Sequence, residues 1–182
     1  MKNFLITLLA TLSFSCAMAQ QELDFPFQGG SQVMNDYFAQ HLNITDLIKE
    51  RAASGTVIMK FTSDPKGSII KMVVYYADDA SLIEPVINAL KGTNGKWIIP
   101  DKEKSYDFVI PFSITMDSPD TKASKGILQY LNTKSPIVAT DQIPLNLVTL
   151  LPAIAVKYTY TAPATAKHAA KKGKKATDKP IE

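Results

Sequence analysis

The sequence predicts an α+β domain in which helices cover one face of a small antiparallel sheet of three strands. Apolar residues recur with helical spacing after residue 30 and again between residues 81 and 91. Three segments between residues 55 and 114 are instead rich in β-branched and aromatic residues, as strands are. The expected order is therefore helix, helix, strand, strand, helix, strand, with a candidate extra strand near the C-terminus.

The segment "FPFQGGSQVMNDYF", Phe25 to Phe38, begins the domain. Glycines in front of a helix either cradle a phosphate or let the chain turn. No Lys-Ser or Lys-Thr pair follows Gly29 and Gly30 at P-loop spacing, so a turn into the helix is favoured. Ser31 is the expected N-cap of this helix.

A second, shorter helix is expected to begin at Thr45 and to end before Gly55. Its expected inner face consists of Leu47, Ile48 and Ala52.

The third helix is expected within "DDASLIEPVINALKG", Asp78 to Gly92, where Ser81 and Glu84 resemble a capping box. The adjacent carboxylates of Asp78 and Asp79 are better explained as helix-start residues than as a catalytic pair. Trp97, the single tryptophan, follows this helix, and we expect it in the core and not on a binding surface. The expected inner face of the helix is Ile83, Val86, Ile87 and Leu90.

A β-hairpin is the clearest local signal. The segment Gly55–Ser63 alternates, with Val57, Met59 and Phe61 on one side, and Ser68–Tyr76 is the expected returning strand. Between them, "DPKG" has an aspartate that can bond the backbone ahead, a proline that presets φ, and a final glycine. The third strand is expected at Tyr106–Ile114. Its Pro111 lacks an N–H group, so this strand should not be paired on both sides along its whole length.

The N-terminal residues 1–19 have the features of a secretory signal peptide: Lys2, an apolar run, and a small-residue "AMA" site that ends at Ala19. We expect cleavage near Ala19 and a periplasmic or secreted protein. Cys16 is the only cysteine. Its lipidation is the less favoured alternative, because Ser13 stands where a lipobox has leucine.

The C-terminal part divides into an extension at residues 117–163, with a candidate edge strand at Ala153–Thr161, and a tail at residues 164–182. The tail has six lysines against Asp178 and Glu182, and its composition is typical of disorder. A solvated tail is the favoured interpretation. If the tail of an exported protein binds a partner, anionic lipid or lipopolysaccharide is favoured over nucleic acid, which is not an expected partner.

No pattern in the sequence indicates an enzyme. The two histidines, His41 and His168, belong to no metal-binding spacing, and Ser31, Ser54 and Ser68 lack a nucleophile context. We therefore expect neither catalysis nor a metal or cofactor.

The order of several short motifs nevertheless resembles a known family. "FQGG" is followed by "GTVIMKF", "DPKGSI", a helix like "LIEPVINAL", then "KW" and finally "VIPFSI". This order, over Phe25 to Met116, resembles the C-terminal domain of TonB-type energy transducers.

The resemblance implies a periplasmic domain that binds an extended segment of an outer-membrane receptor by adding it as a strand to the sheet edge. It thus implies a role accessory to TonB-dependent transmembrane transport, with weak, transient binding, and a homodimer through edge strands is a further option. The edge implied by the resemblance is the third strand, with Tyr106, Asp107, Phe108, Val109, Ile110, Pro111 and Phe112.

The chain also departs from the family. Gln28 stands where the family favours proline, and no membrane anchor or long tether precedes Phe25, so we expect a stand-alone TonB-like domain. An alternative remains open: "IAVKYTYT" could cover the third strand itself. The protein would then be a self-capped structural envelope protein whose basic tail associates with an anionic surface.

Overall fold

The computed structural model describes residues 25–117, 123–140 and 147–161, which form an α+β fold. The helices are α2 (Gly30–His41), α3 (Asp46–Arg51), the 3-10 turn η2 (Ala80–Leu82), α4 (Ile83–Lys91) and α5 (Ala123–Thr133). The strands are β1 (Gly55–Ser63), β2 (Ile69–Ala77), β3 (Tyr106–Met116), β4 (Ile137–Val138), β5 (Val148–Leu150) and β6 (Ile154–Tyr158). The predicted order of the first six elements is confirmed, with η2 preceding α4.

The sheet has six strands instead of the three expected, and it is mixed. Its order is β4-β2-β1-β3-β5, and β6 also pairs with β3. Strands β1, β2 and β3 are antiparallel, as predicted, whereas β5 and β6 both run parallel to β3. The three strands beyond those expected, β4, β5 and β6, have two, three and five residues. Segments this short have little sequence pattern from which a strand can be predicted.

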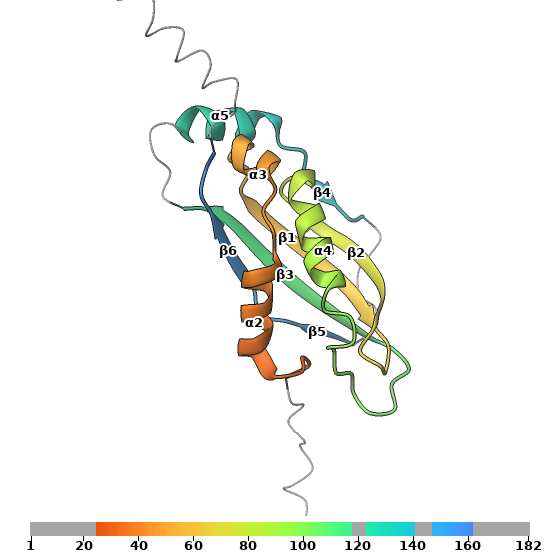
Figure 1. The fold of residues 1–182 in the computed structure, drawn as a ribbon. Coiled ribbons are helices and arrows are strands. Elements are labelled where there is room, and N and C mark those ends of the chain that lie inside the picture. The colour runs from red at the N-terminus through yellow and green to blue at the C-terminus, as the bar shows by residue number, and fades with distance from the viewer. Residues whose placement is uncertain (1–24, 118–122, 141–146, 162–182) are drawn as a thin grey trace, which may run out of the picture.

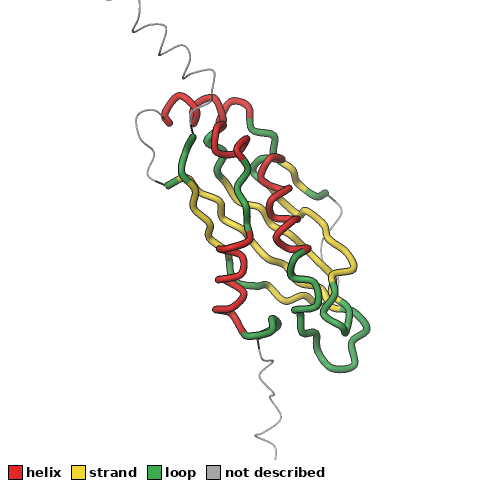
Figure 2. Tube along the Cα trace, in the orientation of Figure 1, coloured by secondary structure: helices red, strands yellow, loops and turns green. Residues whose placement is uncertain are grey.

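One face of the sheet is covered by helices, and Figures 1 and 2 show α2 and α4 lying in front of the strands. The alternation of β1 sends Val57, Met59 and Phe61 to this face, where each is at most 1 % exposed. On the same face, Phe38 of α2 packs edge-on against Phe112 of β3, with ring centroids 5.2 Å apart. The core lies between this face and the helices.

The glycine pair makes a turn, as expected. Gly29 and Gly30 both have positive φ, 91° and 83°, and the Gly30 N–H donates to the Phe27 carbonyl. The prediction of Ser31 as N-cap is wrong, because α2 already begins at Gly30 and Gly29 is its N-cap. The turn brings Phe27 into a bridge with Trp97, so the start of the domain pairs with the segment after α4.

Trp97 is a core residue, in agreement with the prediction. It is 2 % exposed, and its indole N–H donates to the Thr93 hydroxyl over 2.9 Å. Its ring centroid lies 5.0 Å from Phe27, 4.5 Å from Phe61 and 5.5 Å from Phe108.

The hairpin turn forms as the sequence predicts. The Gly67 N–H donates to the Asp64 carbonyl, and the Asp64 carboxylate accepts from the N–H groups of Lys66 and Ser68, each over 2.9 Å.

The helix starts agree with expectation only in part. Thr45 caps α3 as predicted, but Leu47 is 56 % exposed and does not face the core. At the third helix, the N–H of Ser81 donates to Asp79, so an aspartate caps η2 in place of the expected Ser81–Glu84 box.

Within the described residues, no helix is long and apolar enough to cross a membrane. The expected signal peptide, Cys16 and the lysine-rich tail lie outside the described residues.

Candidate binding edge of strand β3

The seven candidate residues lie consecutively on β3 and alternate between its two faces. Phe108, Ile110 and Phe112 point into the core and are at most 1 % exposed. Tyr106 is half-buried beside Phe108, with ring centroids 5.2 Å apart. The other three, Asp107, Val109 and Pro111, are half-buried on the face that the helices do not cover. A segment bound at this edge would therefore contact β3 mainly through its backbone.

One side of β3 pairs with β1 from Tyr106 to Ile114. The register runs without a shift from Gly55 opposite Ile114 to Ser63 opposite Tyr106. Such a regular strand leaves backbone N–H and C=O groups for pairing on its other side, and Pro111 is the one residue of β3 without an N–H group.

The other side of β3 is occupied by the chain itself. Strand β5 pairs with Asp107–Val109, and β6 pairs with Phe112–Met116. Of the two arrangements that the sequence left open, a free third strand or one covered by "IAVKYTYT", the structure has the covered one. The pairing is interrupted opposite Ile110 and Pro111, which agrees with the prediction that Pro111 prevents complete pairing on both sides.

An ion pair stabilises the uncovered face of β3. Lys60 of β1 lies 2.5 Å from one carboxylate oxygen of Asp107, and the Thr62 hydroxyl donates to the other over 2.6 Å. Burial alone would raise the pKa of Asp107, but the hydrogen bonds from Lys60 and Thr62 outweigh it and hold that pKa below its usual value. The same contact with Asp107 raises the pKa of Lys60. Both side chains are therefore charged near neutral pH, and this pair fixes β1 against β3 beside β5.

Two tyrosines attach the C-terminal part of the chain to the start of β1. The Tyr158 hydroxyl of β6 donates to the Ala53 carbonyl over 2.7 Å, and the Tyr130 hydroxyl of α5 donates to the Ser54 carbonyl over 2.8 Å. Burial raises the pKa of Tyr158, and burial with the nearby carboxylates raises the pKa of Tyr130 to about 12. Both hydroxyls therefore stay protonated and remain donors near neutral pH.

Helix α5 is further held by a buried carboxylate. Asp79 is 1 % exposed, and its oxygens accept from the N–H groups of Ser81 and Ser135 and lie 3.5 Å from the guanidinium of Arg51. Burial alone would raise the pKa of Asp79, but its hydrogen bonds and the charge of Arg51 outweigh it and lower that pKa. Asp79 is a structural acceptor that joins η2 to the chain after α5.

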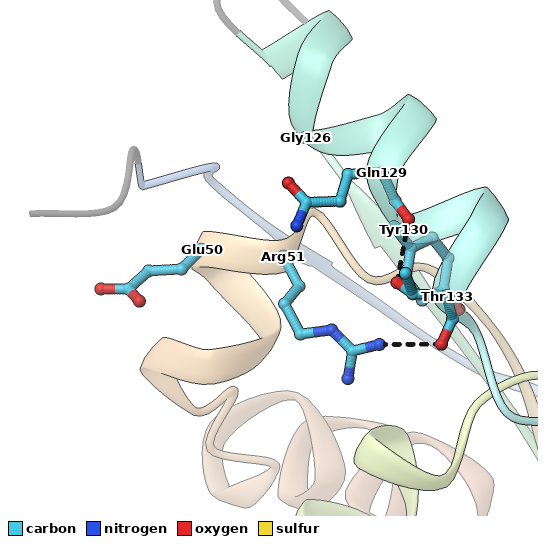
Figure 3. Close-up of a pocket in the computed structure, with 6 residues that line it drawn as sticks. All are labelled: Glu50, Arg51, Gly126, Gln129, Tyr130 and Thr133. Atoms are coloured by element: carbon cyan, nitrogen blue, oxygen red, sulfur yellow. Dashed lines mark hydrogen bonds between the residues drawn. The ribbon is translucent and has the colours of Figure 1, made fainter. Parts of the chain in front are cut away.

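Arg51 of α3 lies against α5 beside a small cavity of about 130 Å³ (Figure 3). Its guanidinium lies 5.9 Å from the Tyr130 ring centroid and donates to the Thr133 carbonyl at the end of α5 over 3.5 Å. The cavity lies between α3 and α5, and none of its lining residues belongs to β3. We interpret it as a feature of helix packing.

The second sheet edge is less regular than the first. Strand β4 pairs with Tyr76 and Ala77 of β2, and among the described residues no strand pairs with the outer side of Ile69–Val74. The register of β2 against β1 shifts at two places, leaving Ile70 and Tyr75 without direct partners. Bulges of this kind disrupt an edge and disfavour the addition of a further strand. Of the two edges, β3 is the better template.

The remaining candidates from the sequence have local roles. His41 is exposed, stacks on Tyr37 with ring centroids 4.1 Å apart, and makes a 2.8 Å hydrogen bond with the Tyr37 carbonyl. Asp78 accepts from the Thr56 N–H and the Tyr76 hydroxyl, and so does not face the same partners as Asp79. In the described part of the chain, no cluster of histidine, cysteine or carboxylate side chains has metal-binding geometry.

The sequence predicted the strand that forms β6, including Tyr158, but it predicted neither β5 nor the hydrogen bonds that the Tyr130 and Tyr158 hydroxyls make. The signal for Tyr158 was its place in the series Ile154, Val156, Tyr158, all of which are buried at this edge. The sequence around Tyr130 and around the three residues of β5 has no pattern that indicates their hydrogen-bonding partners.

Comparison with known proteins adds no family assignment. No protein-family model matches the chain, and neither the curated proteins nor the solved structures contain a match.

Proposed function

We propose that this chain is a non-catalytic protein-binding domain of the cell envelope, of the TonB C-terminal type. It binds extended segments of envelope or outer-membrane transport proteins by adding them as strands to β3, as an accessory to TonB-dependent transport. The observation that carries the proposal is the outer side of β3, which already pairs in parallel with two short extended segments, β5 and β6. An edge that accommodates three- and five-residue strands of its own chain has the geometry to accept a short strand from another chain.

The binding step requires an exchange. A bound segment would take the place of β5, β6 or both, because these strands fill the hydrogen-bonding positions of β3. Strand β5 is the weaker of the two, because its three residues include Leu150, whose side chain is 72 % exposed. Strand β6 buries Ile154 and Tyr158, which are 2 % and 5 % exposed. The exchange should therefore begin at β5, beside Asp107–Val109.

The pairing of β5 and β6 with the outer side of β3 also favours a second candidate function. If β5 and β6 never leave β3, the domain is a self-capped structural protein of the envelope. Both candidates have the same fold, and they differ in whether the C-terminal segment separates from β3 on a time scale that allows a partner to bind.

Amide spectra of the isotope-labelled chain from Gln20 onward distinguish the two candidates. The probes are N-terminal segments of TonB-dependent receptors and, as a matched peptide, residues 147–161 of this chain. Strand addition predicts shifted amides at Tyr106–Ile114 and faster hydrogen exchange in β5 and β6 when a peptide is present. The proposal fails if the shifts are scattered or absent and both strands keep their protection at saturating peptide, which is the outcome expected for a permanent cap.

A scrambled version of the 147–161 peptide is the control for non-specific contacts. It has the same composition but loses the alternation of Ile154, Val156 and Tyr158, so it should leave the β3 amides unchanged.

A further inference from the structure

The outer side of α5 has an apolar surface that the fold does not use. Leu128 and Leu131 are 63 % and 54 % exposed, whereas Tyr130 of the same helix is buried. Residues three apart lie on one side of a helix, so the two leucines form one ridge. Figure 3 shows the opposite side of α5, where Gly126, Tyr130 and Thr133 face α3.

Lysines flank this ridge at both ends. Lys125 precedes Leu128 by three residues and Lys134 follows Leu131 by three, and both lysines are exposed. The Lys134 N–H donates to the Tyr130 carbonyl, so the helical hydrogen bonding extends to this residue. From Thr121 to Thr140 the sequence has three lysines and no acidic residue. The surface is therefore apolar at its centre and positively charged at its margins.

Two acidic side chains on the side of α5 opposite the ridge already have partners of their own. Asp79 is buried against Arg51 and backbone N–H groups, and Asp78 accepts from Thr56 and Tyr76, although the Lys134 charge is near enough to help lower its pKa. Figure 3 shows Glu50 directed away from α5.

The end of the described chain lies beside the same helix. The Tyr160 ring lies so close to Gly126 that a Cβ atom there would be 3.2 Å from it, and the Thr161 N–H donates to the Lys49 carbonyl of α3. The described chain therefore ends beside α3 and α5. The sequence beyond residue 163 has six lysines and two acidic residues.

We propose that the Leu128–Leu131 ridge of α5 binds the surface of an anionic phospholipid bilayer. The two leucines enter the boundary between headgroups and acyl chains, and Lys125 and Lys134 keep their ammonium groups among the phosphates. A purely apolar partner would gain nothing from these charges, whereas an anionic bilayer complements both features.

Co-sedimentation with vesicles tests the proposal, using the chain from Gln20 to Glu182. Vesicles of phosphatidylglycerol mixed with phosphatidylethanolamine should bind the protein, and phosphatidylcholine vesicles should bind it much more weakly. The double variant Leu128→Ser/Leu131→Ser should weaken binding to the anionic vesicles by about tenfold or more, because both apolar insertions are lost. Serine at exposed positions should leave the fold intact, which the Trp97 emission spectrum verifies.

The matched control is Val33→Ser/Ile70→Ser, which removes two exposed apolar side chains from α2 and β2. It should bind the anionic vesicles as the unaltered chain does. Equal binding by the Leu128→Ser/Leu131→Ser variant would overturn the proposal and assign binding to the basic segment alone. A ridge variant that changes sedimentation of the protein without vesicles would also overturn it, because the ridge would then be a contact between two copies. These results are independent of peptide binding at β3.

Discussion

The two tyrosine hydroxyls that attach the C-terminal part of the chain provide the most direct test of the cap on β3. We consider Tyr158→Phe and Tyr130→Phe, which keep both rings and remove only the hydroxyls. The Ala53 residue that accepts from Tyr158 is 0 % exposed, whereas Ser54, which accepts from Tyr130, is half-buried. Water can replace the lost donor at Ser54 more easily than at Ala53.

The magnitudes follow from this difference in burial. A buried carbonyl that loses its donor costs about 1–3 kcal/mol, whereas an ordinary net hydrogen bond contributes about 0.5–1.5 kcal/mol. We therefore expect the free energy of unfolding to fall by about 2 kcal/mol for Tyr158→Phe and by about 1 kcal/mol for Tyr130→Phe. Because the two carbonyls belong to adjacent residues, the double variant should deviate from the sum of the two effects.

Urea unfolding followed by the emission of Trp97 measures these changes, since Trp97 is the single tryptophan and lies in the core. Tyr106→Phe is the comparison variant: its hydroxyl meets the Thr149 hydroxyl over a longer 3.2 Å and in a half-buried position, so the expected loss is smaller. The reasoning is refuted if Tyr158→Phe is as stable as the unaltered chain, or if Tyr106→Phe is the most destabilised of the three.

Three further predictions concern the β-hairpin turn and two carboxylates. Gly67→Ala should lower the midpoint of urea unfolding well below that of Gly95→Ala. Both glycines have positive φ, but only at Gly67 would the new Cβ atom clash, because it would lie 2.6 Å from a backbone oxygen. Equal midpoints would show that the clash is relieved without cost. Asp79→Ala should reduce the free energy of unfolding by about 1–3 kcal/mol, because it removes the buried carboxylate that accepts from the Ser81 and Ser135 N–H groups and pairs with Arg51. Unchanged protection of the Ser135 amide in hydrogen exchange would argue against this. Because the pKa of Asp107 is lowered on folding, its ion pair stabilises the protein at pH values above its ordinary 3.8 and loses that contribution as the pH falls below it. The stability difference between the unaltered chain and Asp107→Asn should thus shrink on acidification, and a constant difference between neutral and acidic pH would contradict this assignment.

Local chemistry made part of this fold predictable. The Asp64–Gly67 turn formed as expected because its aspartate, proline and glycine each favour that geometry whatever lies nearby. The burial of Val57, Met59 and Phe61 followed from the period of a strand with one covered face. The Ser31 cap was mispredicted, because the helix begins one residue earlier, at Gly30, directly after the segment in which Phe27 pairs with Trp97, far along the chain.

The sequence by itself determined the central antiparallel strands, the order of the helices, and the interruption of pairing on the outer side of β3 near Pro111. Only the tertiary structure decided what occupies the outer side of that strand. In strands of three and five residues, such as β5 and β6, the alternation of side chains is too short to predict the strand's direction or register. Both depend on hydrogen bonds to residues about forty positions earlier. The position of β6 is stabilised by its residue Tyr158, whose partner Ala53 is 105 residues away, and no short-range pattern encodes a contact over that separation.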